Sequence, residues 1–271
     1  MKKYFDWNRF VRLAKFDFVQ RKGFYLGHLP LIFALVSLIH LLAWNVFRFS
    51  RDFIPTNNLK ITFFIGLILA TIVISGNSFR EFYKKETALQ FLMVPASSFE
   101  KFFLKLLVGI LPVVLFYPFV YDWAVEFSIF LTVFIQKSIL GKVVIVEEYR
   151  PIIQLGKTFT NPVGGPWWGP ISLITFLFFF PLYFYLGGLL YPKRPKIYSF
   201  ITLLAFGLIL IMFVSLFSVS LKTPIPFLLS YPELSESTPM SSSSLIMLVF
   251  FWLTIPAMLF LSYFKLKEKE V

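Results

Sequence analysis

The sequence predicts an all-α integral membrane protein with six transmembrane helices, and three observations lead to this fold class. The 271 residues are 58% hydrophobic and 15% charged, whereas a soluble domain carries about 25% charged residues. The apolar residues are gathered in blocks of about 20, the length at which a helix crosses the hydrocarbon of a bilayer. Basic residues are concentrated between alternate blocks, as they are in cytoplasmic loops.

Residues 1–26 precede the first apolar block and predict an interfacial amphipathic helix. Charges occur throughout this segment, which lacks the apolar core and small-residue cleavage site of a signal peptide. Helical spacing gathers five apolar residues on one side: Trp7, Phe10, Val11, Ala14 and Phe18. Leu13 and Phe16 interrupt the polar side, so we expect the helix to lie between lipid headgroups and protein.

Six apolar blocks predict the spans. They cover residues 27–47, 61–76, 102–120, 169–191, 197–219 and 245–264, and the third span could extend to residue 135 as one long helix. With the N-terminus inside, 18 of the 26 Lys and Arg residues fall on the cytoplasmic side of the membrane. We therefore expect both termini to be cytoplasmic. This topology and anionic lipid headgroups account for the net charge of +12 without a nucleic-acid partner.

Two long segments lie outside on this topology. Residues 136–168 contain a β-prone run at 143–146 and end at Trp167 and Trp168, which we expect to mark the return to the membrane interface. Residues 221–244 are rich in Pro and Ser and predict an irregular loop. Neither segment is long enough to fold alone, so residues 1–271 are expected to form a single membrane domain with a small extracytoplasmic segment.

The composition and motifs exclude several kinds of chemistry. Cysteine is absent, which excludes disulfides, thiolate metal sites and a cysteine nucleophile, and two histidines are too few to favour a histidine metal centre. The Gly-Lys-Thr at residues 156–158 resembles the end of a phosphate-binding loop. However, the earlier glycine that such a loop requires is replaced by Pro151, so we expect a surface turn.

Ionisable residues within the spans have a functional and a structural interpretation. Asp122 and Glu126 lie one helical turn apart near the outer end of the third span, where they form a candidate polar pathway or simply meet water at the membrane surface. His40 has no obvious acidic partner, which favours a hydrogen bond to a neighbouring helix over a proton relay.

Residues 77–100 interrupt the apolar pattern between the second and third spans. Ser78 and Glu81 have the spacing of a capping box that starts a helix, Pro95 would stop that helix, and Ser97 and Glu100 form a second capping box. Five apolar residues would give the first helix a stripe: Phe79, Phe82, Leu89, Leu92 and Met93. Glu81 also has favourable helical spacing to Lys84 and Lys85. The segment is either an ordinary amphipathic connector or a rigid helix presented to a cytoplasmic partner.

The same segment, FREFYKKETALQFLMVPASSFEKFFLKLL, resembles the stretch after the second span in short bacterial type-2 ABC transporter permeases. The matching residues are Leu92, Met93, Pro95, Ala96, Ser97, Glu100, Lys101 and Phe102. Residues 186–200, LGGLLYPKRPKIYSF, are similar to the junction of the fourth and fifth spans in that family but depart from it in Pro-Lys-Arg-Pro. Six spans and an N-terminal interfacial helix extend the similarity over the whole chain.

The resemblance implies a permease in the bacterial cytoplasmic (inner) membrane that pairs with a second permease chain, as a homodimer or heterodimer, and with two cytoplasmic ATPase subunits. The segment after the second span would be the coupling helix, with ATPase contacts at Phe79, Arg80, Glu81, Phe82, Lys84, Lys85 and Leu89. Pro95, Ser97 and Glu100 would form a structural elbow. No cofactor or metal is expected in this chain, because ATP and Mg would bind to the partner ATPase. The expected role is export, without enzymatic activity of its own.

Two other functions are compatible with the sequence. A membrane scaffold or sensor would act through the external loops, and a membrane-embedded transferase or hydrolase would use Asp122 and Glu126. The transported substrate is open. The 37 phenylalanines favour an amphipathic or lipidic cargo, although an AT-rich genome would equally give a high Phe content.

Overall fold

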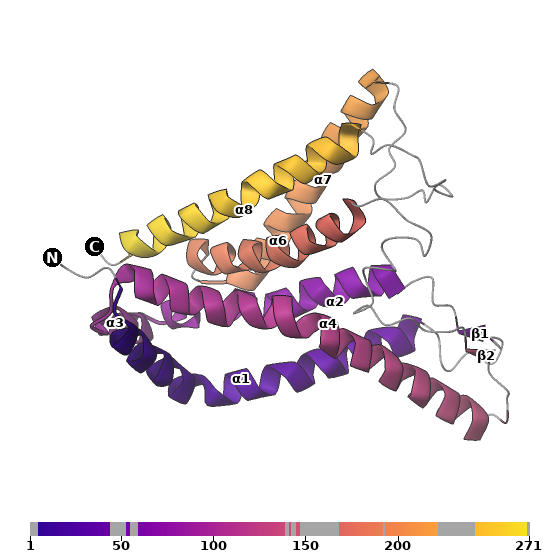
Figure 1. The fold of residues 1–271 in the computed structure, drawn as a ribbon, viewed down its shortest axis with the longest axis horizontal. Helices are drawn as coiled ribbons and strands as arrows, with labels where there is room; N and C mark the ends of the chain where they lie inside the picture. The colour runs from indigo at the N-terminus through magenta and orange to yellow at the C-terminus, as the bar shows by residue number, and fades with distance from the viewer. Residues whose placement is uncertain are drawn as a thin grey trace.

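The computed structural model describes residues 5–43, 53–54, 59–138, 141, 145–146, 168–191, 193–221 and 242–269. These residues are mainly helical, as the sequence predicted, and include one pair of two-residue strands. In Figure 1 the helices converge at the end that holds both termini and α3, and they spread apart at the other end. We call the converging end the terminal end.

Helix α1, Trp7–Ala43, joins the predicted interfacial helix and the first span into one element. Its backbone leaves helical geometry at Arg21 (φ −120°, ψ 17°), and its two parts, Trp7–Phe24 and Gly27–Leu42, are bent by 41°. The change of direction that the sequence predicted between an interfacial helix and a span therefore occurs within one helix.

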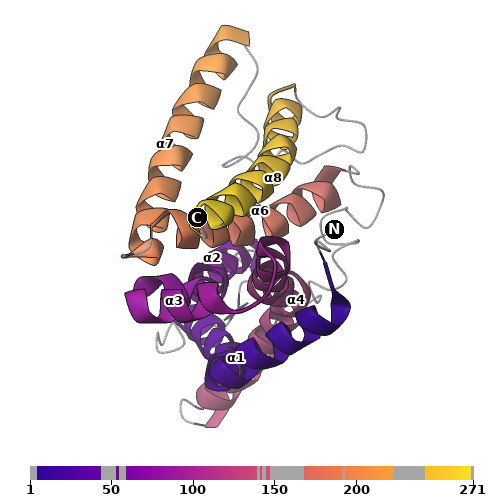
Figure 2. The same ribbon diagram turned by 90° about the vertical axis from the view of Figure 1, so that its left-hand side faces the viewer.

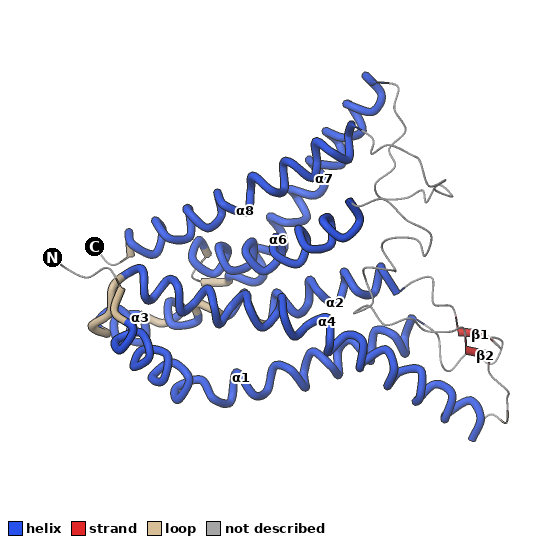
Figure 3. The backbone as a smooth tube through the Cα atoms, viewed as in Figure 1, coloured by secondary structure: helices blue, strands red, loops and turns tan. Residues whose placement is uncertain are grey.

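A compact connection follows the second long helix. Helix α2, Leu59–Val73, is followed by two 3₁₀ turns, η1 (Ser75–Asn77) and η2 (Arg80–Tyr83), and by helix α3, Lys85–Met93. Helix α4, Ser98–Ser138, then continues for 41 residues. This confirms the longer of the two lengths considered for the third predicted span. Figure 3 shows the connection as loops and short helices gathered at the terminal end.

The second half of the chain forms helices α6 (Trp168–Leu190), α7 (Pro195–Leu221) and α8 (Ser242–Glu268). Figure 2 shows α7 leaning away from the group formed by α1, α2 and α4. Strands β1 (Phe53–Ile54) and β2 (Ile145–Val146) pair in parallel, so part of the β-prone run forms a strand. Most of the two predicted external segments lies outside the described residues, as do residues 156–158 and Trp167.

Within the described residues, two helices are long and apolar enough to cross a membrane: Ser98–Ser138 and Val249–Glu268. The bent pair in α1 gives a third candidate if it is one span. Three shorter apolar helices accompany them: Thr62–Asn77, Ile174–Leu190 and Pro195–Ile209. Two or three spans are thus supported by length and composition, and the full set of six stays a prediction.

Among the described residues, three apolar clusters form the interior of the bundle. The largest joins α1, α2, α4 and α6 around Val36, Leu67 and Tyr121. A second cluster, around Phe79 and Tyr185, joins the connection after α2 to α4, α6 and α8. The third lies between the start of α1 and α4, where Phe10 and Leu13 pack with Leu104. The connection between α2 and α4 is therefore part of the packed interior.

Candidate functional site

The first predicted capping box does not form. The Ser78 hydroxyl has no hydrogen-bond partner among the described residues, and η2 starts without a side-chain cap. The cause is competition from tertiary contacts, because Ser78 packs against Gly109 of α4 and Glu81 is held by charges from other helices. The connection therefore turns twice in 3₁₀ geometry, and its α-helix begins only at Lys85. The prediction of a single helix from Ser78 to Pro95 is wrong.

Tyr83 holds the two 3₁₀ turns together. Its hydroxyl donates a hydrogen bond of 2.8 Å to the carbonyl oxygen of Gly76. Burial raises the pKa of Tyr83 to about 12, so the phenol keeps its proton at neutral pH and remains a donor. Thr87 adds a second link, because its hydroxyl lies 2.6 Å from the carbonyl oxygen of Glu81. The turns are thus fixed by side-chain bonds to their own backbone.

The second predicted capping box is confirmed. The backbone N–H of Glu100 donates to Ser97 Oγ over 3.2 Å, and the backbone N–H of Ser97 donates to Glu100 Oε2 over 2.9 Å. Val94 adopts an extended conformation (φ −60°, ψ 126°), as expected for a residue before proline. Lys101 Nζ donates to the carbonyl oxygen of Leu92 over 2.9 Å and so caps the end of α3. The elbow around Pro95 is therefore rigid.

The elbow also anchors the start of α1. Arg9 donates two hydrogen bonds of 2.7 Å to Glu100, one to each carboxylate oxygen. The backbone N–H of Asp6 donates to Glu100 Oε1 over 2.7 Å. Asp6 in turn caps α1, since its carboxylate accepts the N–H of Asn8 at 2.9 Å. Residues 9 and 100 are far apart in the chain, so sequence spacing gives no signal for this link.

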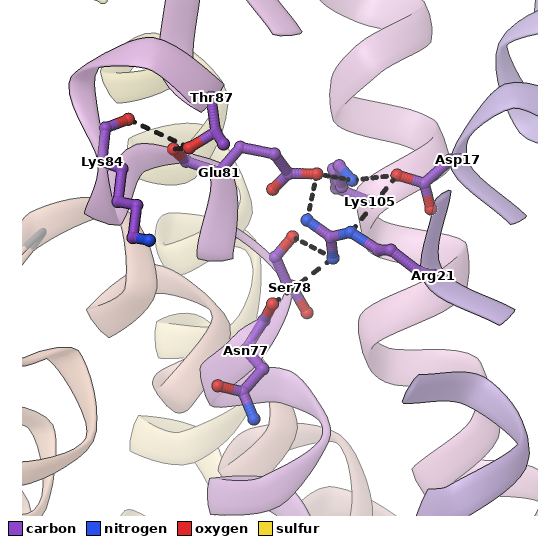
Figure 4. A network of polar contacts seen from close by, with 8 residues as sticks. All are labelled: Asp17, Arg21, Asn77, Ser78, Glu81, Lys84, Thr87 and Lys105. Carbon is purple, nitrogen blue, oxygen red and sulfur yellow. Dashed lines mark hydrogen bonds and ion pairs between the residues drawn. The ribbon is translucent and has the colours of Figure 1, made fainter. Parts of the chain in front are cut away.

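Four charged residues, all buried or largely buried, meet where α1, η2 and α4 converge at the terminal end (Figure 4). We call Asp17, Arg21, Glu81 and Lys105 the four-charge cluster. Lys105 Nζ pairs with Asp17 and lies 2.6 Å from Glu81 Oε1. Arg21 also pairs with Glu81, and its Nε lies 3.7 Å from Asp17 Oδ1. Two acids and two bases give the cluster no net charge.

Arg21 connects the cluster to the backbone of the turns. Its Nη1 lies 3.5 Å from the carbonyl oxygen of Asn77 and 3.4 Å from that of Ser78. Arg21 is also the residue at which α1 leaves helical geometry. The bend of α1 is therefore clamped to the connection after α2.

Two members of the cluster, Asp17 and Lys105, are buried, and the other two are largely shielded from solvent. The Lys105 side chain is 0% exposed and that of Asp17 is 6% exposed. The Lys105 ammonium lies 5.0 Å from the centre of the Phe91 ring of α3. A buried pair is costly to desolvate, but once formed it is also costly to break, because removal of one member leaves an uncompensated charge. The cluster thus fixes α1, η2 and α4 relative to one another.

The seven predicted ATPase-contact residues separate into two groups. Phe79 is buried, with its ring centre 4.7 Å from that of Tyr185, and Glu81 is occupied in the four-charge cluster. Phe82 is partly buried against Phe91. The other four are exposed: Arg80, Lys84, Lys85 and Leu89. The predicted helical pairs of Glu81 with Lys84 and Lys85 are replaced by its pairs with Arg21 and Lys105.

The predicted apolar sides of the two surface helices also need correction. In the connection, Phe79 is buried, but Leu89 and Met93 are exposed. In α1, Phe10 and Leu13 are buried, whereas Trp7 and Phe18 are exposed. Asp17 lies on the buried side with Leu13 because it pairs with Lys105. One face of α1 packs on protein and the other carries exposed aromatic residues. The predicted contact of this helix with lipid headgroups stays a prediction.

Asp122 and Glu126 do not share one environment. Asp122 is 2% exposed, whereas Glu126 is exposed on α4. The two carboxylates are thus not enclosed together in a common site. Among the described residues, no group of three or more His, Cys, Asp and Glu side chains could hold a metal ion.

His40 bonds to neighbouring helices, as predicted. Its Nε2 lies 3.0 Å from Thr62 Oγ1 of α2 and 3.1 Å from the Tyr121 hydroxyl of α4. Its Nδ1 lies 2.8 Å from the carbonyl oxygen of Val36. Because that carbonyl can only accept, Nδ1 carries the proton and Nε2 accepts from a hydroxyl. The trio joins α1, α2 and α4.

The residues that structure adds to the prediction are Arg9, Asp17, Arg21 and Lys105. The only sequence signal for them was the presence of acids and bases within otherwise apolar patterns. No family model matches the chain, and no curated protein or solved structure matches it either.

Proposed function

We propose that this chain is the membrane-spanning permease subunit of an ATP-driven ABC exporter, with ATP hydrolysis in a separate cytoplasmic subunit. The observation that carries the proposal is the position of Lys105. This buried lysine of α4 pairs with Glu81 of the connection and with Asp17 of α1. A push on the connection would therefore be transmitted directly to a 41-residue helix.

The exposed side of the connection is suited to binding a partner, and its buried side is suited to passing the movement of that partner to the helices. Arg80, Lys84 and Lys85 present cations that no carboxylate of the described residues pairs with, and Leu89 presents an apolar side chain. Behind them, Phe79 packs on Tyr185 of α6. Charged and apolar groups on the outside can bind a protein partner, while buried contacts to α4 and α6 pass its movement into the bundle.

The proposal includes the complete membrane topology. We propose six spans in the bacterial cytoplasmic membrane, with both termini and the connection on the cytoplasmic side. The longer helices α1, α4 and α8 would supply three of the spans, and the shorter helices α2, α6 and α7 would supply the other three. A second permease chain, identical or different, would close the transport path, and the two ATPase subunits would bind ATP and Mg. Neither ligand needs a site in this chain.

The test is co-purification of the chain with an ATPase encoded beside it, from gently solubilised membranes. Charge reversal at Lys84 and Lys85 (K84E/K85E) should reduce the recovered ATPase about tenfold or more. The new carboxylates would face the acidic groups of the ATPase that the lysines contact, and like charges across an interface cost several kcal/mol. The matched control is charge reversal at Lys193 and Arg194, which are also exposed and add the same charge. Full assembly and transport in K84E/K85E would disprove the docking role of the connection.

A further inference from the structure

A cleft of about 610 Å³ lies between α1 and the connection after α2. This volume falls in the range of roughly 300–1,000 Å³ that small-ligand sites occupy. Its α1 wall includes Leu13, Phe16 and Gln20, and its opposite wall includes Arg80, Lys84 and Gln90. The cleft is therefore apolar on one part of its surface and cationic on another.

Glu81 provides an acceptor in the wall of the cleft. Its side chain is 10% exposed, and Oε1 receives both Arg21 and Lys105. Oε2 is buried and has no hydrogen-bond partner among the described residues. In Figure 4 this second oxygen points away from Lys105. A buried carboxylate oxygen without a donor is costly, so a ligand with an N–H group would be stabilised here.

Arg80 and Lys84 provide the complementary charge. Both line the cleft, both are exposed, and no carboxylate among the described residues pairs with either. Asp17 and Glu81 are engaged in the four-charge cluster, Glu100 pairs with Arg9, and Glu86 does not line the cleft. The two cations are thus available to a phosphate.

The position of the cleft along α1 fits the level of lipid headgroups on the proposed topology. The apolar part of α1 starts at Gly27. At a rise of 1.5 Å per residue, Asp17 and Arg21 lie about 9–15 Å before Gly27 along the helix axis. On the same topology, the bend of 41° in α1 shortens the distance from Asp17 and Arg21 to the membrane surface. The exposed Phe16 belongs to the same wall, and Phe is common on the apolar face of helices that lie at the boundary of headgroups and acyl chains.

We propose that this cleft binds the phosphoethanolamine headgroup of a phospholipid from the inner leaflet. The primary ammonium would donate to Glu81 Oε2, the phosphate would accept from Arg80 and Lys84, and the upper acyl chain would lie along Phe16. A group with only a negative charge would leave Glu81 unsatisfied, and one with only a positive charge would leave the two cations unpaired. The inference rests on the proposed membrane placement. Arg80 and Lys84 also belong to the proposed ATPase-binding surface, so lipid binding has to be measured without the ATPase.

The test is native mass spectrometry of the full chain, purified in detergent without any ATPase and titrated with single phospholipids. Phosphatidylethanolamine should bind about tenfold or more tightly than phosphatidylcholine, whose methylated nitrogen has no N–H to donate. This comparison changes the ligand alone. It therefore needs no substitution at Glu81, which would also disturb the four-charge cluster.

Two variants test the phosphate contacts. Arg80→Gln and Lys84→Gln should each weaken phosphatidylethanolamine binding at least about threefold, because each removes a charge-assisted hydrogen bond. Lys85→Gln is the matched control, since Lys85 is exposed and does not line the cleft. Equal affinity for the two lipids, or equal binding by the three variants, would overturn the proposal. Loss of ATPase association alone in Arg80→Gln and Lys84→Gln would assign the cleft to a protein partner instead.

Discussion

The ammonium of Lys105 lies 2.6 Å from a carboxylate oxygen of Glu81, and no part of the Lys105 side chain is exposed. The pair joins α4 to the turns that follow α2, and Asp17 extends it to α1. Since the ammonium of Lys105 has three donors and no route to water, its contacts are mutually dependent. Three elements that are separate in sequence therefore behave as one body at the terminal end.

Replacement of Lys105 by Met tests this dependence. Lys105→Met keeps most of the length of the side chain but removes the ammonium that pairs with Asp17 and Glu81. We expect a loss of about 3–5 kcal/mol in the free energy of unfolding, the usual cost of breaking a buried ion pair. Thermal unfolding in detergent measures it as a lowered Tm. Lys85→Met is the control, because Lys85 is exposed and should change Tm little. Equal Tm values in the two variants would mean that Lys105 is not held by buried pairs.

The packing of α4 against the turns depends on Gly109. A Cβ at this position would overlap Ser78 Oγ and lie 3.3 Å from a ring carbon of Tyr185. The Ser75 hydroxyl also donates to the Gly109 carbonyl over 2.7 Å, so the two elements cannot separate without losing that bond. Gly109→Ala should cost about 1–3 kcal/mol through overpacking. A lowered Tm in detergent checks this.

Two further variants establish the cause of that effect. Ser78→Gly should restore much of the stability of Gly109→Ala, because it removes the atoms that the new Cβ meets. Gly207→Ala in α7 is the matched control, since no heavy atom of the described residues lies within 4 Å of its added Cβ. That control should be neutral or slightly stabilising, as alanine favours helix. A Gly109→Ala protein as stable as the control would contradict the close packing.

Local features of the site were predictable from the sequence, and long-range ones were not. The Ser97–Glu100 capping box forms because all its atoms lie within one turn. The box at Ser78 had the same spacing, but Glu81 is drawn to Lys105, 24 residues away. The tertiary ion pairs of Glu81 outweigh the local cap, and sequence spacing carries no information about such distant partners. Similarly, apolar periodicity located the helices but could not reveal that Asp17 lies on the buried side of α1.

The contact between Arg9 and Glu100 gives a prediction about local opening. Glu100→Gln would weaken both hydrogen bonds from Arg9 and the capping bond to Ser97. The start of α1 should therefore detach from the elbow more often. Hydrogen–deuterium exchange of residues 6–20 should rise about tenfold, the change for a loss of about 1.4 kcal/mol. Glu126→Gln is the control on the same helix, since Glu126 is exposed. Unchanged exchange in Glu100→Gln would show that α1 is held by its apolar contacts alone.

Tyr83 gives a prediction about pH. Burial raises its pKa from 10.0 to about 12, so the folded protein favours the protonated phenol. The resulting stability is fully present below pH 10 and is lost as the pH rises through about 12, because the unfolded phenol ionises first. Tyr83→Phe also lacks the hydrogen bond to Gly76 and should be less stable by about 1 kcal/mol near pH 8. Unfolding midpoints in denaturant, measured for both proteins from pH 8 to pH 11.5, should converge as the pH rises. The other tyrosines are common to both proteins and do not affect the difference between their unfolding midpoints. If that difference stays constant across this pH range, the pKa of Tyr83 is not raised by folding and its phenol is in contact with water.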